Sequence, residues 1–317
     1  MALWDDELEA LRPQLRTEAA EFLGSWPTPV DDRAASIAER VAAQRAARVG
    51  GMGVSERAVD RSIEGPAGPI RLRTFVPDQV DAVFLHIHGG GWIIGEPEMT
   101  DLLNEIVADA LHVAIVSVDY RLAPEHPYPA GPDDCEAAAV WLLEKAEAEF
   151  GTERLLIGGE SAGAHLSAVT LLRMRDRHNA VDRFLGANLV FGVYDLSHTP
   201  SQQGIGVPPG GDILTVDGIR FFTELFAPGR SPEGRRDPDL SPLYADLHDL
   251  PPALFTVGAA DHLVDDTLFF AQRWALAGNS SELLVYPEAP HGGIGMPTVL
   301  AHWYPRLLEF LQTCLKS

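Results

Sequence analysis

The chain contains 317 residues, of which 46% are hydrophobic and 22% are charged, a composition typical of a soluble globular protein with a core of useful size. Acidic residues outnumber basic residues by 46 to 24, and the net charge of −22 argues against nucleic acid and anionic membrane surfaces as partners. The sequence shows neither a basic leader with an apolar run nor a stretch of about 18 apolar residues, so we expect a cytoplasmic protein without a membrane span.

The first part of the chain has a helical pattern. Apolar residues recur at helical spacing over residues 8–23, and Pro27 and Pro29 end this pattern. A second helix is expected over residues 32–48. Because no strand separates the two helices, residues 1–48 are predicted to be an appendage to the domain that follows.

From residue 54 the pattern changes to strands that alternate with helices. A probable hairpin comes first, with strands over residues 58–63 and 70–76 joined by a Gly- and Pro-rich turn. The other strands are expected at residues 82–87, 113–118, 154–158, 185–191, 253–257 and 282–286. The helices are expected at residues 99–111, 133–150, 164–177, 263–277 and 298–315. Eight strands in this alternation predict an α/β fold, in which helices flank a mostly parallel sheet.

One long segment interrupts the alternation after the sixth strand. It contains clusters of Gly and Pro and a short helical stretch at residues 216–226. Loops of this length are usually functional, and this one follows a strand at the edge where ligands bind to such sheets. We therefore predict that residues 197–238, together with residues 1–48, form a helical cap. The two parts of the catalytic domain are then residues 49–196 and 239–317.

A Gly-x-Ser-x-Gly motif stands between a predicted strand and a predicted helix. It consists of Gly159, Ser161 and Gly163 with the residues between them. In a nucleophile elbow of this kind the turn is too tight for side chains at the flanking positions, and the helix N-terminus favours developing negative charge. So short a motif can occur by chance, but the strand before it and the helix after it argue against that alternative. Ser161 is the predicted nucleophile.

A serine nucleophile needs a base and an orienting acid, which follow it in the order Ser, Asp or Glu, His in this type of fold. His291 lies in a glycine-containing loop after the last predicted strand and is the predicted base, whereas His165 is expected to be structural. The predicted acid is Asp261, on the loop after the preceding strand. Asp265 and Asp266 are close enough to be alternatives, but we expect them in the first turn of the next helix.

Stabilising the oxyanion requires backbone N–H groups on both sides of the substrate carbonyl. One is expected from Ala162, the residue after the nucleophile, and the others from the sequence HGGGW at residues 88–92, which follows the third strand. As a phosphate-binding loop this run would lack the Lys-Ser/Thr that should follow it. Trp92 is predicted to bind substrate by lining the acyl pocket, with simple packing as the alternative.

Several of these motifs resemble those of the bacterial hormone-sensitive lipase family of α/β-hydrolases. They are HGGGW at residues 88–92, DYRLAPE at 119–125, GESAG at 159–163, LSPLYAD at 240–246 and LPPA at 250–253. Their order and spacing match over about residues 54–315. The resemblance implies a catalytic triad and an oxyanion hole under a helical cap. The triad would be Ser161, Asp261 and His291, and the oxyanion hole would be Gly89, Gly90 and Ala162.

Two departures from the family pattern stand beside the predicted acid and base. The family usually has Asp-Pro-Leu-x-Asp at the acid, where this chain has DHLVD at residues 261–265. The family usually has His-Gly-Phe at the base, where this chain has Gly293 in place of the aromatic residue. The second departure predicts a wider pocket beside His291.

The resemblance implies a serine carboxylesterase that acts on small esters with short to medium acyl chains, without a cofactor or a metal. An amidase or deacetylase with the same triad remains an alternative. A ligand-binding protein of this fold that has lost catalysis is disfavoured, because His291 is present. The apolar strand at residues 282–286 is expected at the edge of the sheet, where it predicts a homodimer.

Overall fold

The computed structural model describes residues 3–25, 35–48, 53–206 and 213–316. The predicted break at Pro27 and Pro29, and the predicted helix start at residue 32, lie outside these ranges. Within the described ranges, two helices precede the first strand, namely α1 (Asp6–Ser25) and α2 (Ile37–Arg48).

Eight strands form one sheet in the order β1-β2-β4-β3-β5-β6-β7-β8. They are β1 (Val59–Gly65), β2 (Gly68–Phe75), β3 (Ala82–Ile87), β4 (Val113–Val118), β5 (Leu155–Glu160), β6 (Phe184–Val190), β7 (Ala253–Gly258) and β8 (Ser281–Tyr286). The hairpin of β1 and β2 is antiparallel, and β2 also runs antiparallel to β4. The remaining strands are parallel to one another in the order β4, β3, β5, β6, β7 and β8. Every residue of β3, β4 and β7 is buried, as expected for parallel strands covered on both faces. The predicted eight-stranded α/β-hydrolase fold is confirmed.

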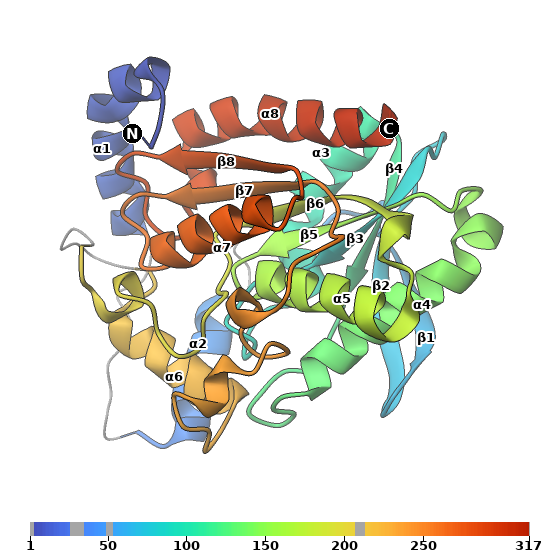
Figure 1. Ribbon diagram of the computed structural model, residues 1–317, viewed down its shortest axis with the longest axis horizontal. Coiled ribbons are helices and arrows are strands. Elements are labelled where there is room, and N and C mark those ends of the chain that lie inside the picture. The colour runs from blue at the N-terminus through green and yellow to red at the C-terminus, as the bar shows by residue number, and fades with distance from the viewer. Residues whose placement is uncertain (1–2, 26–34, 49–52, 207–212, 317) are drawn as a thin grey trace.

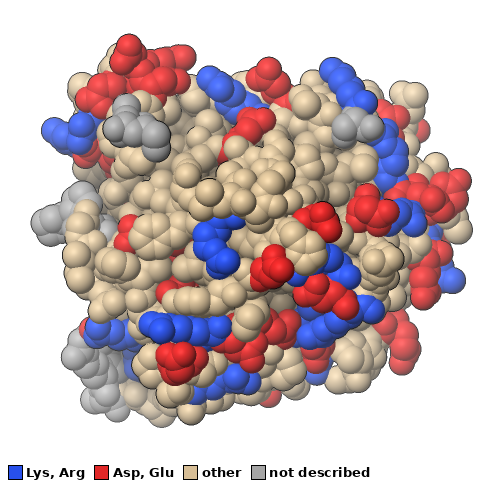
Figure 2. Space-filling view, in the orientation of Figure 1, with Lys and Arg blue, Asp and Glu red and all other residues tan. Residues whose placement is uncertain are grey.

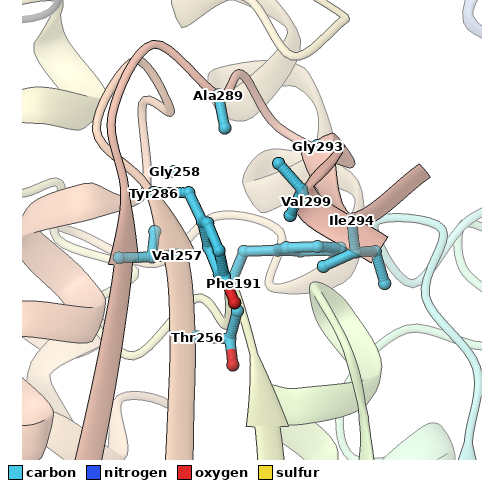
Figure 3. A pocket seen from close by; sticks show the side chains of 9 residues that line it. All are labelled: Phe191, Thr256, Val257, Gly258, Tyr286, Ala289, Gly293, Ile294 and Val299. Atoms are coloured by element: carbon cyan, nitrogen blue, oxygen red, sulfur yellow. The ribbon is translucent and has the colours of Figure 1, made fainter. Parts of the chain in front are cut away.

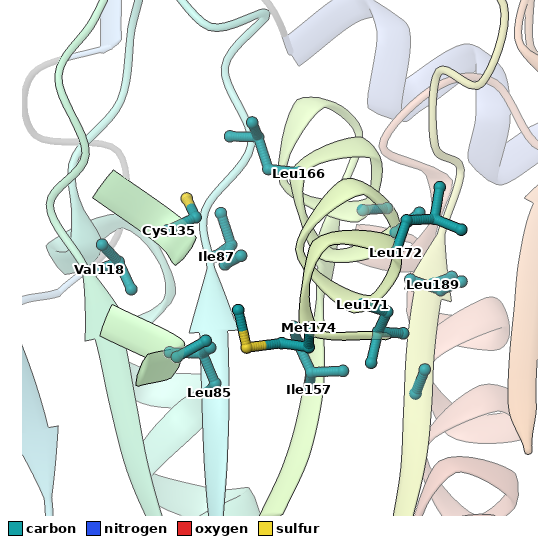
Figure 4. Packing of buried hydrophobic residues seen from close by; sticks show 14 of the residues in the cluster. Leu85, Ile87, Val118, Cys135, Ile157, Leu166, Leu171, Leu172, Met174 and Leu189 are labelled. Carbon is teal, nitrogen blue, oxygen red and sulfur yellow. The ribbon is translucent and has the colours of Figure 1, made fainter. Parts of the chain in front are cut away.

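Helices cover both faces of the sheet (Figure 1). One face carries α4 (Ala130–Phe150), α5 (Ala162–His178) and α7 (Val264–Leu276), and the other carries α3 (Asp101–Leu111) and α8 (Pro297–Lys316). Figure 4 shows the first face, where Leu85 and Ile157 of the sheet lie beside Met174 of α5. Burial of each such side chain contributes about 1.5–3 kcal/mol to stability. The two cysteines, Cys135 and Cys314, are both buried.

The segments predicted as a cap pack in two places. Helix α1 lies beside the start of α8 (Figure 1), and its buried residues Leu8, Leu15 and Ala19 join the core on that face. Helix α2 and the helix α6 (Val216–Phe226) share a separate small cluster with the loop after β3. The members of this cluster are Val41, Ile93, Ile94, Ala123, Phe221 and Leu225. The assignment of residues 1–48 and 197–238 to a cap stays a prediction.

The face of the molecule in Figure 2 mixes acidic and basic side chains, and no broad basic area is visible on it. Among the helices of the described ranges, none combines the length and apolar composition needed to cross a membrane. The parallel strands all end at one edge of the sheet, so the loops after β3, β5, β7 and β8 meet there.

Candidate active site

Ser161 forms a sharp turn between β5 and α5. Its backbone has φ 55° and ψ −119°, a conformation that residues with side chains rarely adopt and that stores strain. The N–H of Ser161 donates to the carbonyl of Val190 at 2.9 Å, which ties the turn to the end of β6. The strand–turn–helix that the motif predicts is therefore present, with the serine at the carboxyl edge of the sheet.

The glycines of the motif are required by close contact with the end of β3. A Cβ atom on Gly159 would lie 2.0 Å from the carbonyl oxygen of Ile87, and a Cβ on Gly163 would lie 1.9 Å from the same atom. Backbone atoms cannot move aside at such distances without shifting the strand. The backbone of the turn therefore packs directly against the end of β3, at the centre of the sheet.

The structure brings Ser161, His291 and Asp261 together. The Nε2 atom of His291 lies 3.1 Å from Ser161 Oγ, and its Nδ1 lies 2.8 Å from Asp261 Oδ2. Asp261 is fully buried, and its other oxygen accepts a bond from the N–H of Leu263 at 2.8 Å. A carboxylate can only accept, so Nδ1 of His291 donates to it and Nε2 is left free to accept the serine proton. The ring of Phe191 packs edge-on against His291 at 4.8 Å between centroids.

Asp266 has a different surrounding from Asp261. Its carboxylate is fully buried in α7 and holds the chain after β6 through several donors. The donors are the N–H groups of Tyr194 and Asp195, the hydroxyl of Thr199 and the side-chain amide of Gln202, at 2.7–2.9 Å. Burial raises the pKa of Asp266 to about 7. Asp266 lies in the first turn of α7, as expected, and its hydrogen-bond partners are in the chain after β6 rather than at His291.

The glycine loop, residues 88–95, lies between the elbow and α6. A Cβ on Gly89 would lie 3.5 Å from the Cβ of Ser161, so this backbone runs directly beside the serine. The loop turns at Gly90, whose carbonyl accepts the N–H groups of Ile93 and Ile94. Gly91 faces α6, where its Cβ would lie 2.9 Å from the ring of Phe222. Gly89 and Gly90 are placed near the serine, but their role toward an oxyanion remains a prediction.

The side chains of His88 and Tyr120 pack together at the start of the glycine loop. Their rings stack at 4.3 Å, and the hydroxyl of Tyr120 donates to the carbonyl of His88 at 3.0 Å. Complete burial lowers the pKa of His88 to about 4, so its ring is neutral at physiological pH. The sequence alone does not indicate this role of Tyr120, although Tyr120 stands in the DYRLAPE motif.

Trp92 is buried rather than open to a pocket. Its indole N–H donates to Nδ1 of His165 at 3.1 Å, and its ring stacks on Phe226 of α6 at 4.5 Å. His165 in turn donates from Nε2 to the carbonyl of Leu240 at 2.8 Å, and its burial lowers its pKa to about 4. These contacts favour the packing alternative for Trp92 over contact with substrate. They also give His165 the structural role expected for it.

The histidine loop, residues 287–296, connects β8 to α8 and carries His291. A small, mostly apolar pocket lies beneath it (Figure 3). The pocket is lined by Phe191, Thr256, Val257, Gly258, Tyr286, Ala289, Gly293, Ile294 and Val299. Within the described ranges, no group of three or more His, Cys, Asp or Glu side chains is placed to hold a metal ion.

A serine, a histidine and a buried aspartate at the carboxyl edge of a mostly parallel sheet define the site of an α/β hydrolase. A model of the α/β-hydrolase fold matches residues 84–294. The chain therefore belongs to the α/β-hydrolase family, and its likeness to the bacterial hormone-sensitive lipase group is confirmed.

Three known proteins illustrate this likeness. The chain is 36% identical to the carboxylic ester hydrolase LipN of Mycobacterium tuberculosis over 75% of its own length and 64% of LipN, so it spans less than two thirds of that relative. It is 35% identical to the esterase LipI of the same organism, over 77% of both chains. The solved structure of an esterase from Pyrobaculum calidifontis matches 96% of this chain and 98% of its own, with a TM-score of 0.80 and 26% identity.

Proposed function

We propose that the protein is a serine carboxylesterase that hydrolyses small esters with short to medium acyl chains. The observation that carries the proposal is the arrangement of Ser161, His291 and Asp261, with 3.1 Å and 2.8 Å between the bonded atoms. The names of LipN and LipI, which are an ester hydrolase and an esterase, support it further.

The reaction runs through an acyl-enzyme. Ser161 Oγ attacks the ester carbonyl while His291 Nε2 takes the hydroxyl proton and later gives it to the leaving alcohol. Asp261 holds the imidazole in the tautomer with the proton on Nδ1 and stabilises the imidazolium that forms. Water activated by His291 then attacks the acyl group and releases the acid. In this scheme the bond between the acyl carbon and the alcohol oxygen breaks first. The bond between the acyl carbon and Ser161 Oγ breaks second.

The oxyanion of each tetrahedral intermediate lies among backbone N–H groups in this proposal. Ala162 supplies one at the start of α5, where the helix N-terminus also favours negative charge. Gly89 and Gly90 supply the others from the glycine loop, whose backbone passes beside Ser161. Removing one such donor in other hydrolases lowers kcat by about 10²–10³-fold.

The test combines labelling with turnover. An alkyl phosphonate should inactivate the protein with one equivalent bound, and peptide mapping should place it on Ser161. Turnover should be measured on p-nitrophenyl acetate, butyrate and longer esters, with the matching anilides beside them. Faster hydrolysis of anilides than of esters would favour the amidase alternative, and an unlabelled Ser161 in an active protein would contradict the mechanism.

We also propose a homodimer that pairs through β8. This strand lies at the edge of the sheet, and Leu283 and Leu284 remain partly exposed on it. Unpaired backbone groups at such an edge can pair with a second copy. Sedimentation at micromolar concentration, with Leu284→Lys as the matched variant, tests this: a wild-type monomer removes the proposal.

A further inference from the structure

The histidine loop is held on one side by the end of the sheet. The carbonyl of Ala289 accepts the N–H of Ala260 at 3.0 Å, and a Cβ on Gly258 would lie only 2.0 Å from that carbonyl oxygen. Phe191, at the end of β6, packs edge-on against the ring of His291. These contacts hold the start of the histidine loop against the sheet. The side of the loop that faces away from the sheet, called its outer side below, is contacted by other elements.

Helix α1 contacts that outer side ahead of His291. Glu288, three positions before the histidine, has φ 63° and turns its carboxylate toward α1. The Nε atom of Arg12 donates to it at 2.7 Å, and Nη2 of Arg16 donates to it at 3.0 Å. The pKa of Glu288 is lowered by its hydrogen bonds to Arg16 and Arg12, so the carboxylate stays ionised.

The same helix contacts the loop just after His291. A Cβ on Gly292 would lie 3.8 Å from the ring of Phe22, and a Cβ on Gly295 would lie 3.1 Å from it. Gly292, Gly293 and Gly295 carry no side chains, and Ile294 among them lines the small apolar pocket. The aromatic ring of Phe22 therefore lies against Gly292 and Gly295, on either side of Gly293, where the sequence predicts a wider pocket beside His291.

A third contact fixes the helix that follows. Glu18 accepts the backbone N–H of Thr298 at 3.0 Å, at the start of α8, and Gln14 donates to the hydroxyl of Thr298 at 2.6 Å. Contacts from α1 thus reach the chain before, beside and after His291. All of them come from α1, whose buried residues Leu8, Leu15 and Ala19 anchor it in the core.

We propose that α1 positions the catalytic base: Arg12, Arg16 and Phe22 are positioning residues that hold the histidine loop so that His291 Nε2 faces Ser161. The proposal rests on the proposed function for its kinetic consequences. The arginine side chains are 41% and 68% exposed, so their ion pairs add little to global stability. The position of a base matters far more, because a misplacement of about 1 Å can cost about 10²-fold in rate.

The first test removes the two cations together. In the double variant Arg12→Gln, Arg16→Gln we expect kcat on p-nitrophenyl butyrate to fall by about tenfold or more, with KM nearly unchanged. The double variant Arg12→Lys, Arg16→Lys keeps both charges and should recover most of kcat. Phe22→Ala should lower kcat in the same way, and Phe22→Leu should lower it less.

A matched control separates positioning from general support. Glu149 pairs with Arg61 between α4 and β1, at similar exposure and away from the histidine loop. Glu149→Gln should leave kcat within about twofold of the wild type, as expected for a surface pair. If the arginine and Phe22 variants keep kcat and lose only melting temperature, α1 supports the fold alone and the proposal is wrong.

A readout without turnover completes the experiment. The proton that His291 Nδ1 shares with Asp261 should give a far-downfield NMR resonance in the wild type. It should broaden or shift in the Arg12→Gln, Arg16→Gln variant and stay unchanged in Glu149→Gln. An unchanged resonance in all variants overturns the role of α1. A wild type that neither hydrolyses esters nor reacts with a phosphonate instead contradicts the proposed function, while the resonance still decides the role of α1.

Discussion

The elbow and the histidine loop meet at 3.1 Å between Ser161 and His291, yet they are held in different ways. The elbow is fixed by backbone packed on backbone, with Gly159 and Gly163 against Ile87 at the centre of the sheet. The outer side of the histidine loop is instead covered by side chains of α1, among them the partly exposed Arg12.

This difference separates stability from activity. A segment packed into the core cannot change position unless the core changes as well, so the fold itself determines where Ser161 lies. A loop held by surface contacts can move while the core stays intact. We therefore expect added side chains at the packed elbow glycines, Gly159 and Gly163, to lower stability and activity together, and changes at α1 to lower activity alone.

The largest expected effect is the loss of the nucleophile. Ser161→Ala should lower kcat on p-nitrophenyl butyrate by about 10⁵-fold or more, as removal of a catalytic serine does in other hydrolases. The substitution removes one oxygen and relieves no packing, so the melting temperature should stay within a few degrees. Substantial residual turnover that a phosphonate still blocks would place the nucleophile elsewhere.

The next effect concerns the acid that orients the base. Asp261→Asn should lower kcat by about 10⁴-fold with the fold intact, because Nδ1 of His291 loses the acceptor that sets its tautomer. Asp265→Asn, on α7 nearby, should change kcat by less than about tenfold. Circular dichroism and thermal melts must accompany the kinetics of both. The reverse pattern, with Asp265 essential and Asp261 dispensable, would overturn the assignment.

A change inside the elbow tests the coupling of stability and activity. In Gly163→Ala the new Cβ would lie 1.9 Å from the carbonyl oxygen of Ile87, so strand and helix must separate. We expect a loss of about 3 kcal/mol or more in the free energy of unfolding, together with a fall in kcat. Denaturant titration and steady-state kinetics measure the two. A stable but slow variant would contradict the view that the core alone places Ser161.

The stability of the region around the elbow should also depend on pH. Burial lowers the pKa of His165 from 6.5 to about 4, so the folded state keeps this ring neutral. Its contribution to stability is present above pH 6.5 and is lost as the pH falls toward 4, by at most about 3 kcal/mol. His165→Gln should flatten this part of the pH dependence of unfolding. An identical slope between pH 6.5 and 4 in both proteins would contradict the prediction.

The smallest effect is expected beneath the glycine loop. Tyr120→Phe removes the hydroxyl that donates to the carbonyl of His88 at 3.0 Å and keeps the stacked ring. We expect a loss of about 1–2 kcal/mol in unfolding free energy, because a buried carbonyl loses its partner. The change in kcat should be small. A fall in kcat beyond about tenfold would show that this bond controls the glycine loop.

The sequence was sufficient for the parts of the fold that depend on local pattern. The strands and helices were predictable from periodicity. Their ends shift by a few residues; for example, α4 begins at Ala130, whereas the sequence predicted a start at residue 133. The elbow is a local motif as well. His291 and Asp261 follow from chain order, because parallel strands bring the loops after them to one edge of the sheet.

What the sequence could not predict depends on contacts between distant segments. Arg12 and Glu288 are 276 residues apart, and on α1 an arginine is indistinguishable from any exposed helical charge. From the sequence, Asp266 is indistinguishable from any acidic residue in the first turn of a helix. In the fold it is buried beneath the chain after β6 and holds that chain in place. Trp92 has no pattern that separates packing from substrate contact.

The pairing of α1 with the histidine loop also has a consequence for biosynthesis. Arg12 leaves the ribosome 276 residues before Glu288, so α1 waits for the synthesis of that whole stretch before its partner exists. Until then its apolar face, with Leu8 and Leu15, has no α8 to cover it. A nascent chain with a finished elbow therefore still lacks the contacts proposed to hold His291, and the proposed esterase activity should emerge only after the histidine loop and α8 have been released.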